Sequence, residues 1–346
     1  FLLSVAIFFF RTSKKRIFTS VRAKKIYTMK KWLSLFSLLV LLSSCDKKNK
    51  IEKEVEEIPV TIKVERFDKI FYETPVENFQ NIKQKYPYFF PAATPDSIWV
   101  NKINNPLYRE LYTEVQKKYS NFEKVNSDLV SLFQHIKYYF PNTKTPKVVT
   151  LISEMDYQNK AIYTDSLVLI SLDLYLGKSH KFYEFPEYLK QNFEQTQIMP
   201  DIVSSFSETK IPFGNNKSLL SYMVYAGKQL YLKDVLLPEC SDADKIGYTL
   251  EQINWCQENE SYMWRNFMEE QLLYSTDSKL PSRFINPAPF SKFYLEIDNE
   301  SPGRVGTWLG WQIVRSFMNN NDINLQQLLQ MDPIELFQNS KYKPKK

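Results

Sequence analysis

Histidine, the side chain that most often binds zinc or activates a nucleophile, is scarce in this sequence. The chain contains only His135 and His180, which lie 45 positions apart. A catalytic zinc usually takes three protein ligands, often two histidines one helical turn apart. We therefore expect no metal ion and no cofactor. A Ser-His-Asp triad around either histidine stays open, although no Gly-x-Ser-x-Gly motif supports one.

Carboxylates are more numerous and lie close together in two stretches. Four flank the predicted strands and two precede the last long helix: Glu154, Asp156, Asp165 and Asp173, then Asp298 and Glu300. Paired carboxylic acids can perform general acid–base catalysis when burial separates their pKa values. Aspartate also stabilises turns and caps helices routinely. We favour this structural role over catalysis.

Cys45 is the residue whose surroundings are most informative. A basic pair and an uncharged apolar run at residues 32–42 follow Met29, and two serines then lead into Cys45. The apolar run is shorter than the roughly 20 residues that a membrane-spanning helix needs. This order is typical of a bacterial lipoprotein signal. We expect cleavage before Cys45 and lipidation (palmitate) of its sulfur, with an ordinary signal peptide as the alternative.

The signal also defines the expected organisation of the chain. The sequence begins with Phe1, and residues 1–28 are expected to be a gene-model extension ahead of a signal peptide at 29–44. Residues 45–58 read as a charged tether, and residues 59–346 as one domain. Residues 1–44 hold nine basic residues and no acidic one, so without them the formal charge of +6 becomes −3. No basic surface for nucleic acid is therefore expected.

Cys240 and Cys256 remain after the lipidated cysteine. Outside the inner membrane a disulfide between them is chemically permitted. Their spacing makes the bond one alternative and does not require it.

Helical periodicity dominates the sequence that follows. Apolar residues recur at helical spacing over about 125–140 and 220–238, and a third long segment covers about 242–274. Ser301-Pro302 is expected to begin another helix, because proline is favoured in a first helical turn. Strand patterns are few and short, at 60–64, 148–152, 161–164 and 167–172. The sequence therefore predicts a helix-rich α+β domain with a small sheet.

The two histidines are expected in different settings within these elements. His135 falls outside the apolar stripe of the helix at 125–140, so we expect it at the surface. His180 lies in the polar stretch Lys178–Lys181, which predicts a loop.

Three of the seven glycines are concentrated at Gly303, Gly306 and Gly310. Spacings of three and four place them on one face of a helix, where each glycine costs up to about 1 kcal/mol relative to alanine. Tight packing of this helix inside the protein is the favoured explanation, and a groove for a partner or ligand is the alternative. Arg304 is expected either to hold an acidic group or to pair with Asp298 or Glu300.

Several longer motifs resemble one known family, that of the gliding-motility lipoprotein GldB. They are Arg66–Asp68, Leu174–Gly177, Leu250–Trp255, Asn259-Glu260, Met263-Trp264, Pro289–Phe293, Ser301–Gly306, Trp308–Trp311 and Ser340–Pro344. The resemblance covers essentially the whole chain after the signal. It implies a membrane-anchored component of the apparatus by which certain bacteria glide, associated with a dedicated protein-secretion system.

The resemblance also implies a fold similar to that of zinc peptidases (zincins), whose chemistry depends on a His-Glu-x-x-His helix. The matching segment is residues 198–211, where Pro200–Ser204 contains no histidine. Relatives carry an acidic residue before a Gly-Lys pair, whereas Ala226 precedes Gly227-Lys228 here. Both departures imply a pseudoenzyme, a peptidase-like shell that has lost its metal.

The leading hypothesis is a non-catalytic envelope lipoprotein, a scaffold that faces the periplasm and contacts other proteins of the gliding and secretion apparatus. A metal-independent envelope hydrolase acting on peptide or peptidoglycan is the first alternative. A glycan- or peptide-binding lipoprotein that uses the glycine-rich helix as one wall is the second.

Overall fold

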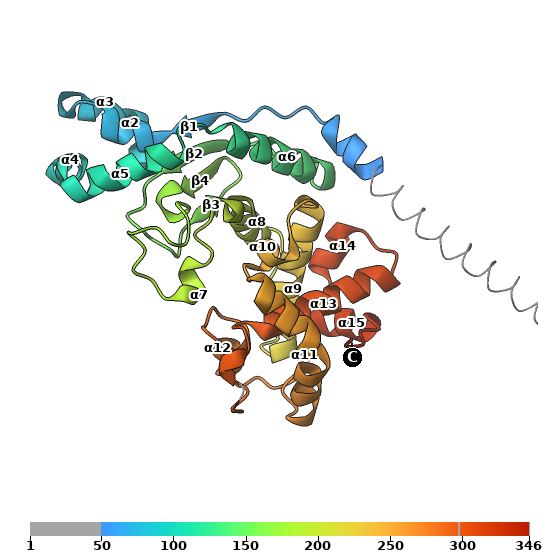
Figure 1. Ribbon diagram of the computed structural model, residues 1–346. Helices are drawn as coiled ribbons and strands as arrows, with labels where there is room; N and C mark the ends of the chain where they lie inside the picture. Colours follow the sequence, from blue (N-terminus) through green and yellow to red (C-terminus); the bar gives the residue numbers. More distant parts are fainter. Residues whose placement is uncertain (1–49, 297, 346) are drawn as a thin grey trace, which may run out of the picture. The chain divides into compact units, whose positions relative to one another are not determined.

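Figure 1 shows a computed structural model of the chain, in which residues 50–296 and 298–345 are described. The chain divides into two units at residue 59, and each is described by itself. In the first unit, residues 50–56 are helical. Lys50 and Glu54 form an ion pair of 3.8 Å across one turn of this helix.

The second unit is built around a four-stranded mixed sheet in the order β1-β2-β4-β3. β1 (Val64–Arg66), β2 (Lys147–Leu151) and β4 (Leu167–Ser171) run parallel, and β3 (Ala161–Tyr163) pairs antiparallel with β4. The last three strands lie where the sequence predicts them, whereas β1 begins four residues later than expected. Val148 and Val149 are both fully buried, because helices cover both faces of the sheet.

One face of the sheet carries an aromatic core. Val149 packs there beside Phe67 and Phe89, whose ring centroids lie 4.3 Å apart. Asn105 caps the longest of the covering helices by accepting bonds from the amides of Leu107 and Tyr108. The helices of this layer are α2 (Phe67–Glu73), η1 (Val76–Asn78), α3 (Phe79–Lys85), η2 (Pro87–Phe89), α4 (Asp96–Asn104) and α5 (Pro106–Lys118).

Val148, on the opposite face, belongs to a second and larger core. Its central helices are α9 (Leu219–Leu236) and α13 (Val305–Asn320), which pack side by side (Figure 1). The other helices of this part are α6 (Glu123–Tyr139), η3 (Leu172–Leu174), α7 (Glu187–Lys190), η4 (Gln195–Gln197), α8 (Ile198–Glu208), α10 (Asp242–Ile246), α11 (Leu250–Glu269), α12 (Leu280–Phe284), η5 (Asp298–Glu300), α14 (Leu325–Gln330) and α15 (Pro333–Asn339).

Two predicted helix boundaries are wrong. The segment expected at 242–274 is interrupted at Gly247, which ends α10 in the left-handed conformation with φ 72°. The last long helix begins at Val305 and not at Ser301-Pro302. The backbone before it is held by tertiary contacts, because the Ser301 hydroxyl donates to the carbonyls of Asp298 and Ser291.

The prediction of a helix-rich α+β fold is confirmed by the helices and the small mixed sheet. Among the described helices, none combines the length and the apolar character required to cross a bilayer.

Candidate functional site

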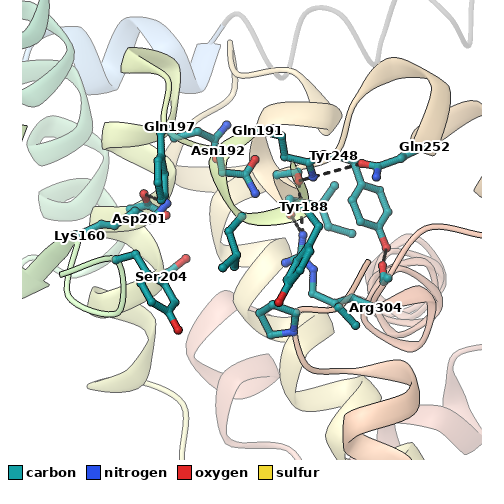
Figure 2. Close-up of a pocket in the computed structure, with 18 of the residues that line it drawn as sticks. Lys160, Tyr188, Gln191, Asn192, Gln197, Asp201, Ser204, Tyr248, Gln252 and Arg304 are labelled. Carbon is teal, nitrogen blue, oxygen red and sulfur yellow. Dashed lines mark hydrogen bonds and ion pairs between the residues drawn. The ribbon is translucent and has the colours of Figure 1, made fainter. Parts of the chain in front are cut away.

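The candidate site is a cavity of about 570 Å³ in the second unit (Figure 2). Its walls come from the loop before β3, α7 and the chain after it, α8, the end of α9, the α10–α11 junction and the chain before α13. Pockets that enclose small molecules typically measure about 300–1,000 Å³. The cavity is therefore large enough for a small ligand or one end of a longer one.

Lys160 and Asp201 form an ion pair on one side of the cavity (Figure 2). The Lys160 ammonium lies 2.6 Å from Asp201 Oδ2, which also accepts a bond of 2.9 Å from the Tyr175 hydroxyl. Burial, together with the neighbouring Asp201, raises the pKa of Tyr175 well above its usual value, so this hydroxyl stays protonated and donates. Asp201 is the only carboxylate among the residues that line the cavity.

Arg304 lies on the other side and is fixed by backbone carbonyls. Its Nη2 donates to the carbonyl oxygens of Ile246, at 2.7 Å, and Gly247, at 3.4 Å. The guanidinium also lies 5.3 Å from the centroid of the Tyr248 ring. Gln191 donates to the same Gly247 carbonyl at 3.1 Å. The left-handed turn that ends α10 therefore positions Arg304.

Lys233 brings a third basic side chain to the lining from α9. Only 8% of this residue is exposed, and its ammonium donates to the Lys245 carbonyl at 2.8 Å. Burial lowers the pKa of Lys233 to about 8, although the nearby Asp201 opposes the shift. The cavity thus contains three basic side chains and one carboxylate.

Neither histidine lines the cavity. The expectation that His135 lies at the surface is wrong: it is 4% exposed and its Nδ1 lies 2.8 Å from the Ser131 carbonyl. Tertiary packing covers more of α6 than its apolar stripe predicts. His180 lies in a loop, as expected, and its Nε2 is 3.3 Å from Glu114.

The acidic residues singled out in the sequence are not brought together into one site. Asp156 and Asp298 accept bonds from neighbouring backbone amides in turns, and Glu154 pairs with Lys102. Asp165 and Glu300 are exposed. Asp173 differs, because it is fully buried and burial raises its pKa to about 6.

Asp173 stabilises a turn of unusual conformation. Its carboxylate accepts bonds from the amides of Ser153, at 2.9 Å, and Met155, at 2.8 Å. In this turn Glu154 has a φ of 58° and Met155 a φ of 66°. Residues other than glycine rarely adopt this left-handed region. Asp173 therefore has a structural role in this turn.

The three clustered glycines do not share one helical face, because Gly303 precedes α13. Each lies against backbone: an added Cβ would come within 2.1 Å of the Ala288 carbonyl oxygen at Gly303, 2.9 Å of that of Phe284 at Gly306, and 1.9 Å of that of Met223 at Gly310. Gly303 and Arg304 also line the cavity. Arg304 pairs with neither Asp298 nor Glu300 in the described part of the chain, because its guanidinium bonds carbonyls instead.

The structure describes two of the three cysteines. Cys45 lies outside the described residues. Cys240 and Cys256 are free thiols, and burial raises the pKa of both. No group of three or more His, Cys, Asp or Glu side chains within the described ranges has the arrangement of a metal site.

Lys160, Lys233 and Asp201 were not predicted from the sequence as residues of a site. One weak signal was available for Lys233, because it lies in α9 between the apolar residues Leu232 and Leu236, although the charged Asp234 directly follows it. A basic residue is almost never fully buried without a partner or a function. Lys160 and Asp201 carry no comparable signal, since only the fold brings their segments together.

Two motifs behind the family resemblance support the fold. Arg66 and Asp68 form a bidentate ion pair, with Nε–Oδ1 at 2.9 Å and Nη2–Oδ2 at 2.7 Å. Tyr342 of the C-terminal motif donates to the buried Glu260 at 2.8 Å, and its ring packs edge-on against Trp264. Gln116 of α5 also donates to Asp68 at 2.8 Å, so both motifs connect the ends of the domain to its helices.

Comparison with known proteins adds one finding. A sequence model of a family described as gliding motility protein GldB matches residues 48–344. No curated protein and no solved structure matched the chain. The resemblance to zinc peptidases therefore receives no support from solved structures.

Proposed function

The chain belongs to the gliding motility protein GldB family, and from this premise we propose that it is an envelope lipoprotein that supports gliding without catalysing a reaction. Family membership supports the role in gliding and the lipoprotein character. The finer parts of the proposal are attachment through Cys45, a position facing the periplasm, and contact with other proteins of the gliding and secretion apparatus.

The non-catalytic part of the proposal rests on one observation. The side chains of the cavity that could react are held in hydrogen bonds and ion pairs within the protein. Asp201 is bound by Lys160 and Tyr175. Ser204, the one serine in the lining, donates its hydroxyl proton to the Pro200 carbonyl at 3.0 Å. A nucleophilic serine instead donates to a general base. This arrangement is typical of a site that binds rather than reacts.

The loss of a peptidase motif is a further part of the proposal. Asp201 and Ser204 belong to α8, the helix on which the family resemblance places a lost His-Glu-x-x-His motif. Their side chains form hydrogen bonds within the protein, and this favours a pseudoenzyme.

A metal-independent hydrolase is the second candidate, and one observation favours it. Lys233, with a pKa lowered to about 8 by burial, lines the same cavity as Ser204. A lysine with a pKa near neutrality can act as a general base. In this structure, however, Ser204 donates to Pro200 and Lys233 donates to the Lys245 carbonyl, so no bond joins the two.

Complementation of a strain that lacks the gene separates the two candidates. We expect Ser204→Ala and His180→Ala to restore spreading on surfaces to the level of the wild type. Loss of a nucleophile or of a general base typically lowers a rate by about 10²–10⁴-fold or more. If Ser204→Ala is present at the normal level and cells do not spread, the non-catalytic proposal is wrong and the hydrolase takes its place.

A further inference from the structure

The chemistry of the cavity lining indicates the class of ligand that it fits. Its charged side chains are three cations and one carboxylate, and the remaining polar groups are mainly amides and phenols. The amides are Gln158, Gln191, Asn192, Gln197 and Gln252, and the phenols are Tyr157, Tyr188 and Tyr248. Figure 2 shows several of them facing the same space. Such a lining fits a ligand that is polar over most of its surface and carries a negative charge.

Arg304 and Lys233 have N–H groups that form no hydrogen bond within the described part of the protein and could bind an anion. Arg304 uses Nη2 for the two carbonyls, so the N–H groups on Nε and Nη1 are available to a ligand. Lys233 donates one proton to the Lys245 carbonyl and has two more. Both forks of a guanidinium include Nη2, so a carboxylate here would accept single charge-assisted hydrogen bonds, one from Nε or Nη1 of Arg304 and one from Lys233. Arg304 and Lys233 are therefore the groups best placed to bind a carboxylate.

The amides and phenols of the lining fit a ligand that is rich in hydroxyl groups. Each amide offers both a donor and an acceptor, as each sugar hydroxyl does. Two amides are already fixed in position, because Gln191 donates to Gln252 at 3.3 Å and Gln252 accepts from the Thr249 amide at 2.9 Å. Tyrosine combines an apolar ring, which can pack on the C–H face of a sugar, with a polar hydroxyl. An apolar ligand such as an acyl chain would cover the side-chain amides of Gln158 and Asn192 and the Lys233 ammonium without offering them hydrogen bonds, at a considerable cost in free energy.

We propose that this cavity binds an acidic saccharide, with the carboxylate at Arg304 and Lys233 and the hydroxyl groups on the surrounding amides and phenols. The inference rests on the proposed non-catalytic role in one respect, since the site is taken to bind its ligand and not to convert it.

The test uses two pairs of sugars that differ in the acidic group. The full-length protein, purified in detergent, is titrated with N-acetylmuramic acid and N-acetylglucosamine, and with glucuronic acid and glucose, and binding is measured by calorimetry. We expect each acidic sugar to bind at least tenfold more tightly than its neutral counterpart, a difference of about 1.4 kcal/mol. Equal affinity within the pairs, or no binding of any of the four, would overturn the inference.

Three variants show whether binding occurs in this cavity. Arg304→Gln should weaken binding of the acidic sugars about tenfold or more and leave the neutral ones unchanged. Asp201→Asn removes the only carboxylate of the lining and releases Lys160, so it should tighten binding of the acidic sugars. A gain in affinity cannot result from misfolding. Arg265→Gln, which changes an exposed arginine on α11, is the matched control and should have no effect.

The remaining outcomes are also decisive. Weaker binding in Asp201→Asn, or tighter binding of an acidic peptide such as a glutamate-rich hexamer than of any sugar, would contradict the saccharide assignment. Turnover of a bound sugar would instead overturn the non-catalytic role and leave the site in place. Failure to bind would leave the role in gliding untouched, so the two proposals fail separately.

Discussion

Gly227 of α9 and Gly310 of α13 lie back to back: a Cβ added to Gly227 would stand 2.3 Å from the carbonyl oxygen of Gly310. Real Cβ atoms essentially never come so close to a backbone oxygen. The two helices are therefore in backbone contact at this point. Because α9 also carries Lys233 and α13 follows Arg304, this contact fixes the separation of two basic groups of the cavity.

Gly310→Ala should destabilise the protein. The new methyl group would lie 1.9 Å from the Met223 carbonyl oxygen, so one helix has to move. Overpacking costs about 1–3 kcal/mol or more, which exceeds the gain of up to about 1 kcal/mol from replacing glycine in a helix. Urea unfolding measures the difference. Gly214→Ala, where no atom lies within 4 Å, is the control and should change stability little. Equal stability of Gly310→Ala and the wild type would contradict the packing.

Arg315→Gln should also lower stability. The guanidinium pairs with Asp234 and Asp242 at 2.7 Å each and so connects α13 to α9 and α10. Since the Arg315 side chain is 26% exposed, we expect a loss of roughly 1–3 kcal/mol, between the values for surface and buried pairs. The loss is measured by thermal unfolding of the Arg315→Gln variant. Arg265→Gln, at an exposed position, is the control. A loss no larger than the control's would show that the network contributes nothing.

Asp173 should make stability depend on pH in a specific direction. Its pKa is raised in the folded state to about 6 from 3.8, so the folded protein holds the proton more tightly than the unfolded chain. The stability linked to this group is full below about pH 4 and is lost as the pH rises through 6. Its size is at most about 3 kcal/mol.

The comparison that isolates this effect is wild type against Asp173→Asn, by urea unfolding between pH 4 and pH 7. The wild type should gain stability relative to the variant as the pH falls. Asp165→Asn, at an exposed position, serves as the control. If the wild-type and Asp173→Asn curves stay parallel across this range, Asp173 does not titrate as inferred.

Cys45→Ser should release the protein from the membrane. The sequence around Cys45 predicts lipidation of its sulfur, and serine cannot form the thioether. Metabolic labelling with a fatty-acid analogue should mark the wild type alone, and fractionation should place the variant in the soluble fraction. Equal labelling of the two proteins would show that the anchor is elsewhere.

Much of the local structure could be predicted from the sequence, because local patterns specify it. The strands β2, β3 and β4 and the long helices α6 and α9 lie where apolar periodicity places them. The helix boundaries at Gly247 and Val305 were missed, since they depend on a left-handed residue and on contacts with residues far along the chain.

The cavity was decided by the tertiary structure alone. Lys160, Asp201, Lys233 and Arg304 lie on four separate segments, and no spacing along the chain relates them. His135 shows the same limit, because a helical wheel identifies one packing face and cannot reveal a second neighbour. The sequence by itself determined the family, through long motifs, and the secondary structure, through periodicity. The separation of Lys233 and Arg304 depended on the packing of α9 against α13, and thus on contacts between residues more than 80 positions apart. Lys160 and Asp201 meet because the loop before β3 lies beside α8.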